Sequence, residues 1–220
     1  VLLEGPQSRS RDLWLVLRAV KDFVTGFRRL HFVGPCVTVF GSARFTEDHP
    51  YYALGREVGA GLARLGFTVM TGGGPGLMEA ANRGAKEAGG CSVACNVQLP
   101  KEEDPNPYLD HSVQVHHFFV RKVLLFKYSY AFVALPGGFG TMDELFEALT
   151  LIQTGKSRDV PIILVGHEFW QHAINLEFLR DEGVIIPDDV NMISVVDNAD
   201  QAWQTIIDFY DLSPGKCPSC

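Results

Sequence analysis

The sequence has few basic residues for its length, and this shortage excludes a class of partner. Lysine and arginine together number 19 of the 220 residues against 26 aspartates and glutamates, which gives a formal net charge of −7. A broad nucleic-acid-binding face needs clustered Lys and Arg to replace phosphate counterions, so we expect no nucleic acid as a partner. An anionic ligand would instead need a local pocket of hydrogen-bond donors.

Long apolar runs and cysteine pairs are also scarce. No run approaches the roughly 18 apolar residues that a membrane-spanning helix needs, and the opening VLLEGPQSRSRD lacks the pattern of a signal peptide. The cysteines form an odd set, which favours reduced thiols: Cys36, Cys91, Cys95, Cys217 and Cys220. The terminal CPSC is a lone C-x-x-C, and the histidines show no ligand spacing. We therefore expect a cytoplasmic location, no membrane partner, no metal and no cofactor.

Short apolar runs alternate with helical patterns from Pro35 onward. Several of the runs are apolar throughout, which is typical of parallel strands covered on both faces. The runs predicted as strands are CVTVFG (36–41), FTVMTG (67–72), CSVACNV (91–97), SVQVHH (112–117), YAFVALP (130–136), PIILVG (161–166) and MISVV (192–196). We predict an α/β fold with a Rossmann-like, doubly wound, mostly parallel sheet of about seven strands and helices on both faces.

The segment before the first strand has helical periodicity. One stripe contains Leu13, Val16, Val20, Phe23, Phe27 and Leu30. We predict an N-terminal helix that packs on the domain or on a partner chain; a basic amphipathic helix on a membrane surface is the alternative. The expected organisation is a helical extension (1–34), a single α/β nucleotide-binding catalytic domain (35–212) and a flexible tail (213–220).

Two glycine-rich stretches follow predicted strands, at the place where ligands bind in folds of this class. PGGFGTMDE (136–144) contains Gly137, Gly138 and Gly140, and TGGGPG (71–76) repeats the pattern. Glycine permits a positive φ and a close approach of backbone to ligand, and free N–H groups at a helix start favour an anion. Two such loops at neighbouring strand ends predict a nucleotide-sized cleft with a phosphate site. Tight strand-to-helix turns are the alternative.

The common nucleotide motifs do not account for these loops. The dinucleotide fingerprint G-x-G-x-x-G fails because Leu77 occupies the position of its last glycine, and a Walker A loop fails because Thr150 occupies the position of its first. The G-x-S-x-G elbow of α/β hydrolases does not occur in the sequence either.

Glu144 has two interpretations. Thr141 followed three residues later by Glu144 matches a capping box, which is a purely structural device. Its place beside a phosphate-type loop is equally consistent with a functional acid. Arg121 and Lys122, in HHFFVRKVLLF, are predicted to begin a helix and to supply the cationic side of the pocket. A solvated helix face is the alternative for that pair.

Taken together, these motifs resemble the LONELY GUY family, the cytokinin-activating phosphoribohydrolases that are often mislabelled lysine decarboxylases. The resemblance rests on GGGPGLMEAANRGA, on LPKE followed by NPY, on the RK pair and on PGGFGTMDELFEALT, and it spans roughly 35–196. The N-terminal helix and GPGLMEAAN resemble the longer bacterial-type members.

The resemblance implies an enzyme that hydrolyses the N-glycosidic bond of cytokinin nucleoside 5′-monophosphates, with AMP as a further candidate, to free base and ribose 5-phosphate. Arg121 and Glu144 would be the catalytic pair. The substrate-binding residues it implies are Ser42, Gly74, Met78, Glu102, Lys122, Gly137, Gly138, Gly140, Thr141 and Thr150. Family members form homodimers or larger homo-oligomers.

The residue types suit that chemistry. Cleavage of a ribosyl bond develops positive charge on the sugar, which the carboxylate of Glu144 would stabilise. Asp143, Glu79 and a water molecule are the candidates for protonating the leaving base. The alternative function is a non-catalytic carrier that holds a nucleotide or a pterin-type cofactor on the same fold. A pyridoxal phosphate decarboxylase is a third interpretation, but it needs a Schiff-base lysine that the glycine loops do not indicate.

Overall fold

The computed structural model describes residues 5, 6, 8–98 and 104–212. This part of the chain forms a seven-stranded sheet in the order β4-β3-β2-β1-β5-β6-β7, and every pairing is parallel. The strands are β1 (Cys36–Phe40), β2 (Thr68–Thr71), β3 (Ser92–Val97), β4 (His111–Val115), β5 (Ser129–Ala134), β6 (Ile162–Val165) and β7 (Ile193–Val196). The predicted doubly wound parallel sheet is confirmed.

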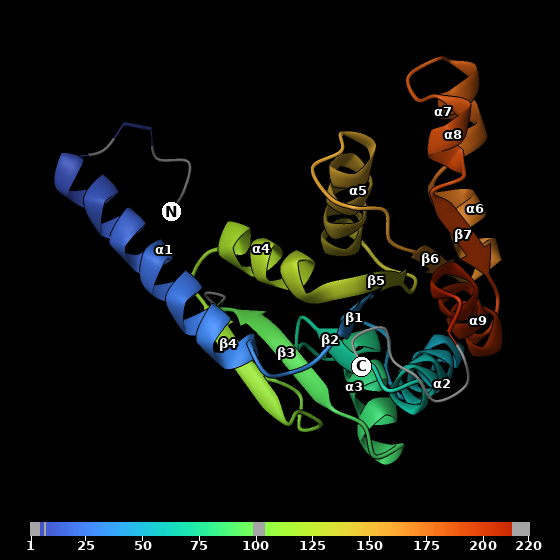
Figure 1. The fold of residues 1–220 in the computed structure, drawn as a ribbon, viewed down its shortest axis with the longest axis horizontal. Coiled ribbons are helices and arrows are strands. Elements are labelled where there is room, and N and C mark those ends of the chain that lie inside the picture. Colours follow the sequence, from blue (N-terminus) through green and yellow to red (C-terminus); the bar gives the residue numbers. More distant parts are fainter. Residues whose placement is uncertain (1–4, 7, 99–103, 213–220) are drawn as a thin grey trace.

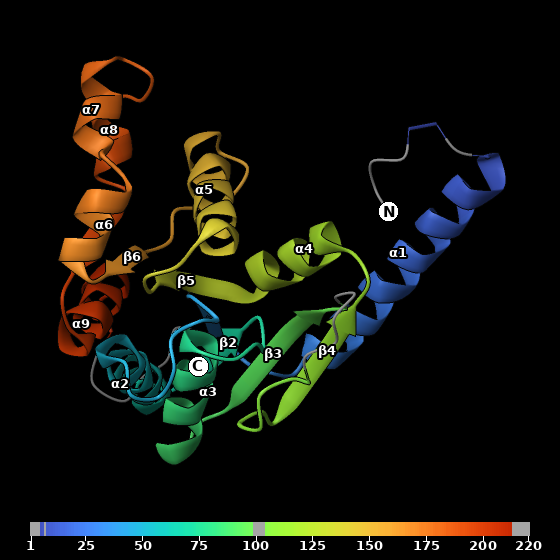
Figure 2. The same ribbon diagram turned by 180° about the vertical axis from the view of Figure 1, so that it is seen from behind.

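Helices cover both faces of this sheet (Figures 1 and 2). The helices of the described chain are α1 (Arg9–Leu30), α2 (Pro50–Arg64), α3 (Leu77–Glu87), α4 (Phe118–Tyr128), α5 (Phe139–Gln153), α6 (His167–Ala173), α7 (Leu176–Asp181), α8 (Pro187–Val190) and α9 (Ala199–Tyr210). Because side chains alternate along a strand, β1 contributes to two cores. Cys36 and Phe40 pack with α1, α4, α5 and α6, whereas Val37 and Val39 pack with α2, α3 and α9.

The strands end within two residues of the predicted positions, and side chains explain the differences. The fourth strand ends at Val115, because the backbone N–H of His116 donates to the buried carboxylate of Asp22 on α1, 2.8 Å away. The fifth strand ends at Ala134, and the chain then turns out of the sheet towards Pro136, whose carbonyl accepts a hydrogen bond from the loop after β1.

Helix α1 packs on the domain through its second half. Its buried residues are Ala19, Asp22, Gly26 and Leu30. Gly26 is needed there, because a Cβ at this position would lie 2.4 Å from a methyl carbon of Leu124 on α4. The apolar stripe of the first half does not pack on the domain, because Leu13, Val16 and Val20 are more than half exposed. Figure 1 shows this half of α1 extending away from the sheet.

The thiols described in the structure are free. Cys36 and Cys95 are buried and Cys91 is partly buried, while the predicted tail with Cys217 and Cys220 lies outside the described residues. Burial raises the pKa of both Cys36 and Cys95 to about 12. None of the described helices is long and apolar enough to cross a bilayer.

Candidate functional site

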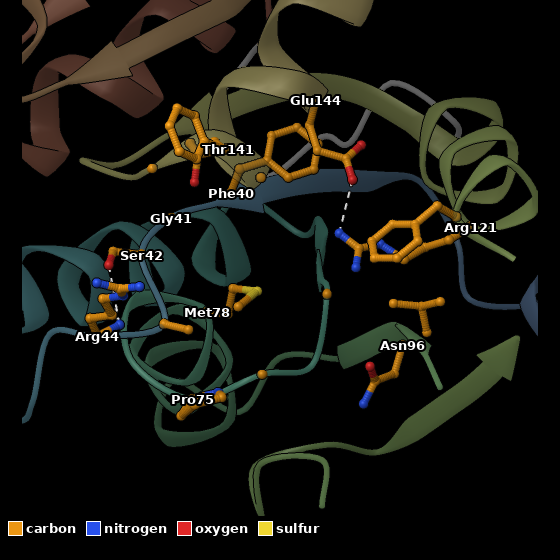
Figure 3. A pocket seen from close by; sticks show the side chains of 18 of the residues that line it. Phe40, Gly41, Ser42, Arg44, Pro75, Met78, Asn96, Arg121, Thr141 and Glu144 are labelled. Atoms are coloured by element: carbon orange, nitrogen blue, oxygen red, sulfur yellow. Dashed lines mark hydrogen bonds and ion pairs between the residues drawn. The ribbon is translucent and has the colours of Figure 1, made fainter. Parts of the chain in front are cut away.

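A cleft of about 700 Å³ opens at the carboxyl ends of the strands (Figure 3). It lies at β1 and β5, where the chain's strand order changes direction, which is the usual ligand position in a doubly wound sheet. Its wall comes from three loops, which follow β1, β2 and β5, and from residues of α3, α4 and α5. The ends of β3 and β4 contribute Asn96 and Gln114.

Ser42 joins these three loops through its backbone. Its N–H donates to the carbonyl of Pro136 at 3.0 Å, and its carbonyl accepts from the N–H of Leu77 at 2.9 Å. Gly76 has φ +70°, and a Cβ there would lie 2.4 Å from the Ser42 carbonyl oxygen. We predicted the two glycine loops at neighbouring strand ends, and this is wrong. Strand β1 lies between β2 and β5, and the loop after β1 connects the two glycine loops.

A buried polar network holds the glycine loop after β2. It consists of Thr71, Asn82, Ser92 and Asn106. The hydroxyl of Thr71 donates to the side-chain oxygen of Asn82 at 2.6 Å and accepts from the N–H of Gly73 at 2.9 Å. Asn106, from the NPY motif, donates to the same Asn82 oxygen and to the Gly74 carbonyl. Each buried polar group is thus paired, which fixes the backbone that faces the cleft.

The loop after β5 differs from its predicted geometry. Helix α5 begins at Phe139 with Gly138 as its N-cap, so Thr141 lies inside the first turn and makes no capping box with Glu144. None of Gly137, Gly138 and Gly140 has a positive φ, contrary to expectation. A Cβ on Gly137 would lie 2.1 Å from the Thr141 hydroxyl, whereas one on Gly138 or Gly140 would meet nothing within 4 Å. The last two glycines therefore border open space.

Arg121 and Glu144 form an ion pair inside the cleft. Arg121 Nη2 on α4 lies 2.8 Å from Glu144 Oε1 on α5, and Glu144 is 2% exposed. Burial raises the pKa of Glu144, and the charges of Arg121 and Lys122 oppose that rise. Glu144 Oε2 and Arg121 Nε are buried without a hydrogen-bond partner among the described residues. The second carboxylate oxygen therefore keeps an unused acceptor capacity in this structure.

Many of the predicted site residues lie together. Those lining the cleft are Ser42, Gly74, Met78, Arg121, Gly138, Gly140, Thr141 and Glu144. Gly137 does not line the cleft, and Glu102 lies outside the described residues. Lys122 does not line the cleft, because its ammonium group pairs with Asp143 and Glu147. Thr150 does not line it either; its hydroxyl donates to the Phe146 carbonyl one turn back on α5.

The two acids considered as proton donors to a leaving group also lie off the cleft. Asp143 pairs with Lys122 at 2.8 Å, and Glu79 accepts a hydrogen bond from the hydroxyl of Tyr52 at 2.8 Å. Neither belongs to the residues that line the cleft. Asp143 and Glu79 are therefore wrong as candidates for that role.

Several lining residues were not anticipated: Phe40, Arg44, Asn96, Gln114, Phe118 and Phe139. Arg44 lies two residues after the predicted site residue Ser42, and its residue type was the available signal. Asn96 and Gln114 are polar residues near the carboxyl ends of β3 and β4. Ligands bind at these ends in doubly wound sheets, so this position was the available signal for both residues. The guanidinium of Arg121 lies 5.6 Å from the centre of the Phe118 ring, a contact that no sequence spacing indicates.

A family model described as "Possible lysine decarboxylase" matches residues 78–206. The chain is 35% identical to the cytokinin riboside 5′-monophosphate phosphoribohydrolase of Mycobacterium tuberculosis, over 68% of this chain and 81% of that protein. It is 31% identical to the protein of the same name from Rhodococcoides fascians, over 69% and 78%. The molybdenum cofactor carrier protein of Chlamydomonas reinhardtii matches with TM-score 0.61 at 23% identity, over 81% of this chain and 99% of that one, and this likeness concerns the fold alone.

Proposed function

The chain belongs to the family described as possible lysine decarboxylases, the LONELY GUY family of phosphoribohydrolases, and from this premise we propose that it hydrolyses nucleoside 5′-monophosphates. Water forms a bond to C1′ of the ribose as the C1′–N bond breaks, and the base leaves with a proton. The products are free base and ribose 5-phosphate. Cytokinin nucleotides, which carry a modified adenine, and AMP are the candidate substrates.

The observation that carries this proposal is the buried pair of Arg121 and Glu144. Glu144 lines the cleft, and its Oε1 accepts a hydrogen bond from Arg121, which orients the carboxylate beside the place proposed for the ribose. The transition state of glycoside hydrolysis carries positive charge on the sugar, and a carboxylate beside the ring stabilises it. Although burial raises the pKa of Glu144, the adjacent guanidinium favours the charged form that this role needs.

The lining residues other than Arg121 and Glu144 suit the phosphate and the base of a nucleoside 5′-monophosphate. Gly138, Gly140 and Thr141 surround the start of α5, where free N–H groups and the helix dipole favour a phosphate. Figure 3 shows Ser42 and Thr141 on the side of the cleft away from Arg121, with Asn96 below Arg121. We place the phosphate at Thr141, the ribose at Glu144 and the base towards the aromatic ring of Phe118 and the amide of Asn96.

The decarboxylase description of the family does not fit the cleft. A pyridoxal phosphate enzyme needs a lysine for its Schiff base. No lysine of the described chain lines the cleft, and Lys122, next to Arg121, is held by two carboxylates. We derive no step through this cofactor. Purified protein should therefore lack the absorbance band of bound pyridoxal phosphate.

We further propose that the chain works as a homo-oligomer in the cytoplasm. Support for the assembly comes from exposed apolar side chains on α1 and α4, two helices that pack on each other. Support for the location comes from the free thiols of Cys36, Cys91 and Cys95, which fit a reducing compartment.

The test of catalysis compares two neutralised acids of α5. Glu144→Gln keeps the size of the side chain and an acceptor for Arg121 but removes the charge. We expect its turnover of AMP and of isopentenyladenosine monophosphate to fall by about 10²- to 10³-fold, the usual effect of losing one stabilising group for the transition state. Asp143→Asn is the matched control, and it should retain most of the activity because Asp143 faces Lys122 outside the cleft.

Chromatography that separates free base and ribose 5-phosphate measures the turnover of both variants. Equal activity of Glu144→Gln and wild-type protein would contradict the proposed role of Glu144. Tight retention of an intact nucleotide by wild-type protein, without products, would indicate a carrier instead of an enzyme.

A further inference from the structure

The charges that line the cleft do not balance. Its charged lining residues are Arg44, Arg121 and Glu144. Arg121 and Glu144 pair with each other, so they contribute little net charge to a ligand. Lys122, the second cation of the RK pair, is neutralised outside the cleft by Asp143 and Glu147. Within the described chain, the positive charge that remains available to a ligand in the cleft is therefore that of Arg44.

The backbone under Arg44 is fixed rather than loose. Its N–H donates to the hydroxyl of Ser42 at 3.1 Å, which closes a tight turn. The backbone of Ser42 is itself bonded to Pro136, at the start of one glycine loop, and to Leu77, directly after the other. Arg44 is exposed, and its guanidinium has no ion-pair partner in the part of the chain that the structure describes. A fixed turn that presents an unpaired guanidinium is suited to holding an anion.

The position of Arg44 identifies which part of a nucleotide it would meet. Figure 3 shows Ser42 and Arg44 at one end of the cleft and Arg121 at the other, with Met78 between them. Ser42 bonds to Pro136, the residue before the loop of Gly137 to Thr141, so Arg44 lies at the end of the cleft where α5 begins. This end holds the predicted phosphate site, while the ribose site lies at Glu144.

We propose that Arg44 is a specificity-determining residue that selects substrates carrying a 5′-phosphate over the corresponding unphosphorylated ribosides. The inference rests on the proposed function and names the cation of its phosphate subsite. A phosphate dianion at the start of α5 would accept hydrogen bonds from backbone N–H groups and would be attracted by the helix dipole. Both of these supply only partial positive charges. The guanidinium of Arg44 supplies a full charge and a planar pair of donors that match two phosphate oxygens.

The kinetic test compares Arg44→Gln with Arg64→Gln, which removes an exposed arginine of α2 that does not line the cleft. KM for AMP should rise about 10- to 100-fold in Arg44→Gln with kcat nearly unchanged, because a charged hydrogen bond made equally in ground and transition states is lost. The value of kcat/KM for adenosine should stay at the wild-type level. Arg64→Gln should match wild-type protein with both substrates.

A binding measurement separates this inference from the proposed function. Calorimetric titration of the protein with ribose 5-phosphate needs no turnover, and Arg44→Gln should weaken that binding by a similar factor while Arg64→Gln leaves it unchanged. Arg44-dependent binding in a protein that cleaves no nucleotide would support the phosphate subsite and refute the hydrolase. Wild-type KM for AMP in Arg44→Gln, or an equal loss of kcat/KM with AMP and adenosine, would overturn the role of Arg44.

Discussion

At the residue scale, Arg121 and Glu144 show what a sequence pattern can and cannot predict. The family resemblance implied that the two are the catalytic pair; from the residues alone, Glu144 was predicted beside a glycine loop and Arg121 in the RK pair of a helix. Their 2.8 Å contact was not predicted, because the two residues lie on different helices and meet through the packing of α4 and α5. The capping-box interpretation of Glu144 failed for a related reason, since α5 begins at Phe139 and not beside Thr141. Where a helix starts decides which way its side chains face.

The raised pKa of Glu144 predicts the pH dependence of activity. If the carboxylate is the active form, kcat/KM should fall as pH drops through a pKa that lies above the ordinary value of a glutamate. Glu144→Gln should remove this acidic limb from whatever activity remains, and Asp143→Asn should keep it. A pH profile of kcat/KM for AMP measures the limb, and an unchanged limb in Glu144→Gln would assign it to another group.

The raised pKa of Glu144 affects stability in the opposite direction to activity: low pH favours the folded state. A native pKa above the unfolded value means that the folded chain binds more protons over that interval, so the contribution of Glu144 is full at low pH and is lost as pH rises through the native pKa. Urea unfolding of wild-type protein and Glu144→Gln across this range should show the difference.

At the element scale, the strands were predictable and the loops were not. Runs that are apolar throughout indicate strands buried on both faces, and each predicted run holds a strand. The ends shifted where side chains compete for the backbone, as Asp22 does at His116. The predicted substrate residues Lys122 and Thr150 lie on the right helices but off the cleft, because one residue along a helix turns a side chain by about 100°.

Two glycine substitutions distinguish a site role from a packing role. Gly140→Ala adds a methyl group that meets nothing within 4 Å, in the first turn of α5. Stability should rise slightly or stay unchanged, by at most about 1 kcal/mol. KM for AMP should nevertheless increase, because the methyl group borders the proposed phosphate site.

Gly61→Ala is the contrasting change. Its Cβ would lie 1.8 Å from the ring of Trp203 on α9, so overpacking should cost about 1–3 kcal/mol. KM for AMP should remain at the wild-type value in the folded protein. Thermal melts and steady-state kinetics measure both variants, and an unchanged KM in Gly140→Ala would argue against a phosphate at this loop.

At the scale of the whole molecule, the unpacked half of α1 has a consequence for assembly. Leu13, Trp14 and Val16 are more than half exposed, and exposed apolar surface of this kind marks an interaction site. No sequence pattern distinguishes this half from the half that packs on α4, because both carry the same apolar stripe. The stripe predicted the helix but not its two different environments.

Val16→Asp therefore tests the proposed homo-oligomer. A charge on the exposed face of α1 should reduce self-association, which light scattering coupled to size-exclusion chromatography detects as a lower mass. Val184→Asp is the matched control, since Val184 is also exposed but lies between α7 and α8, away from α1. An identical mass for both variants and the wild-type protein would exclude this face of α1 from the assembly.

Product analysis is the direct test of whether the cleft at the ends of β1 and β5 cleaves nucleoside 5′-monophosphates. Wild-type protein is incubated with AMP and, separately, with isopentenyladenosine monophosphate, and free base and ribose 5-phosphate are quantified over time. We predict that the two products appear in equal amounts and at equal rates with at least one substrate. Intact nucleotide in both reactions, or base released without ribose 5-phosphate, would contradict the account.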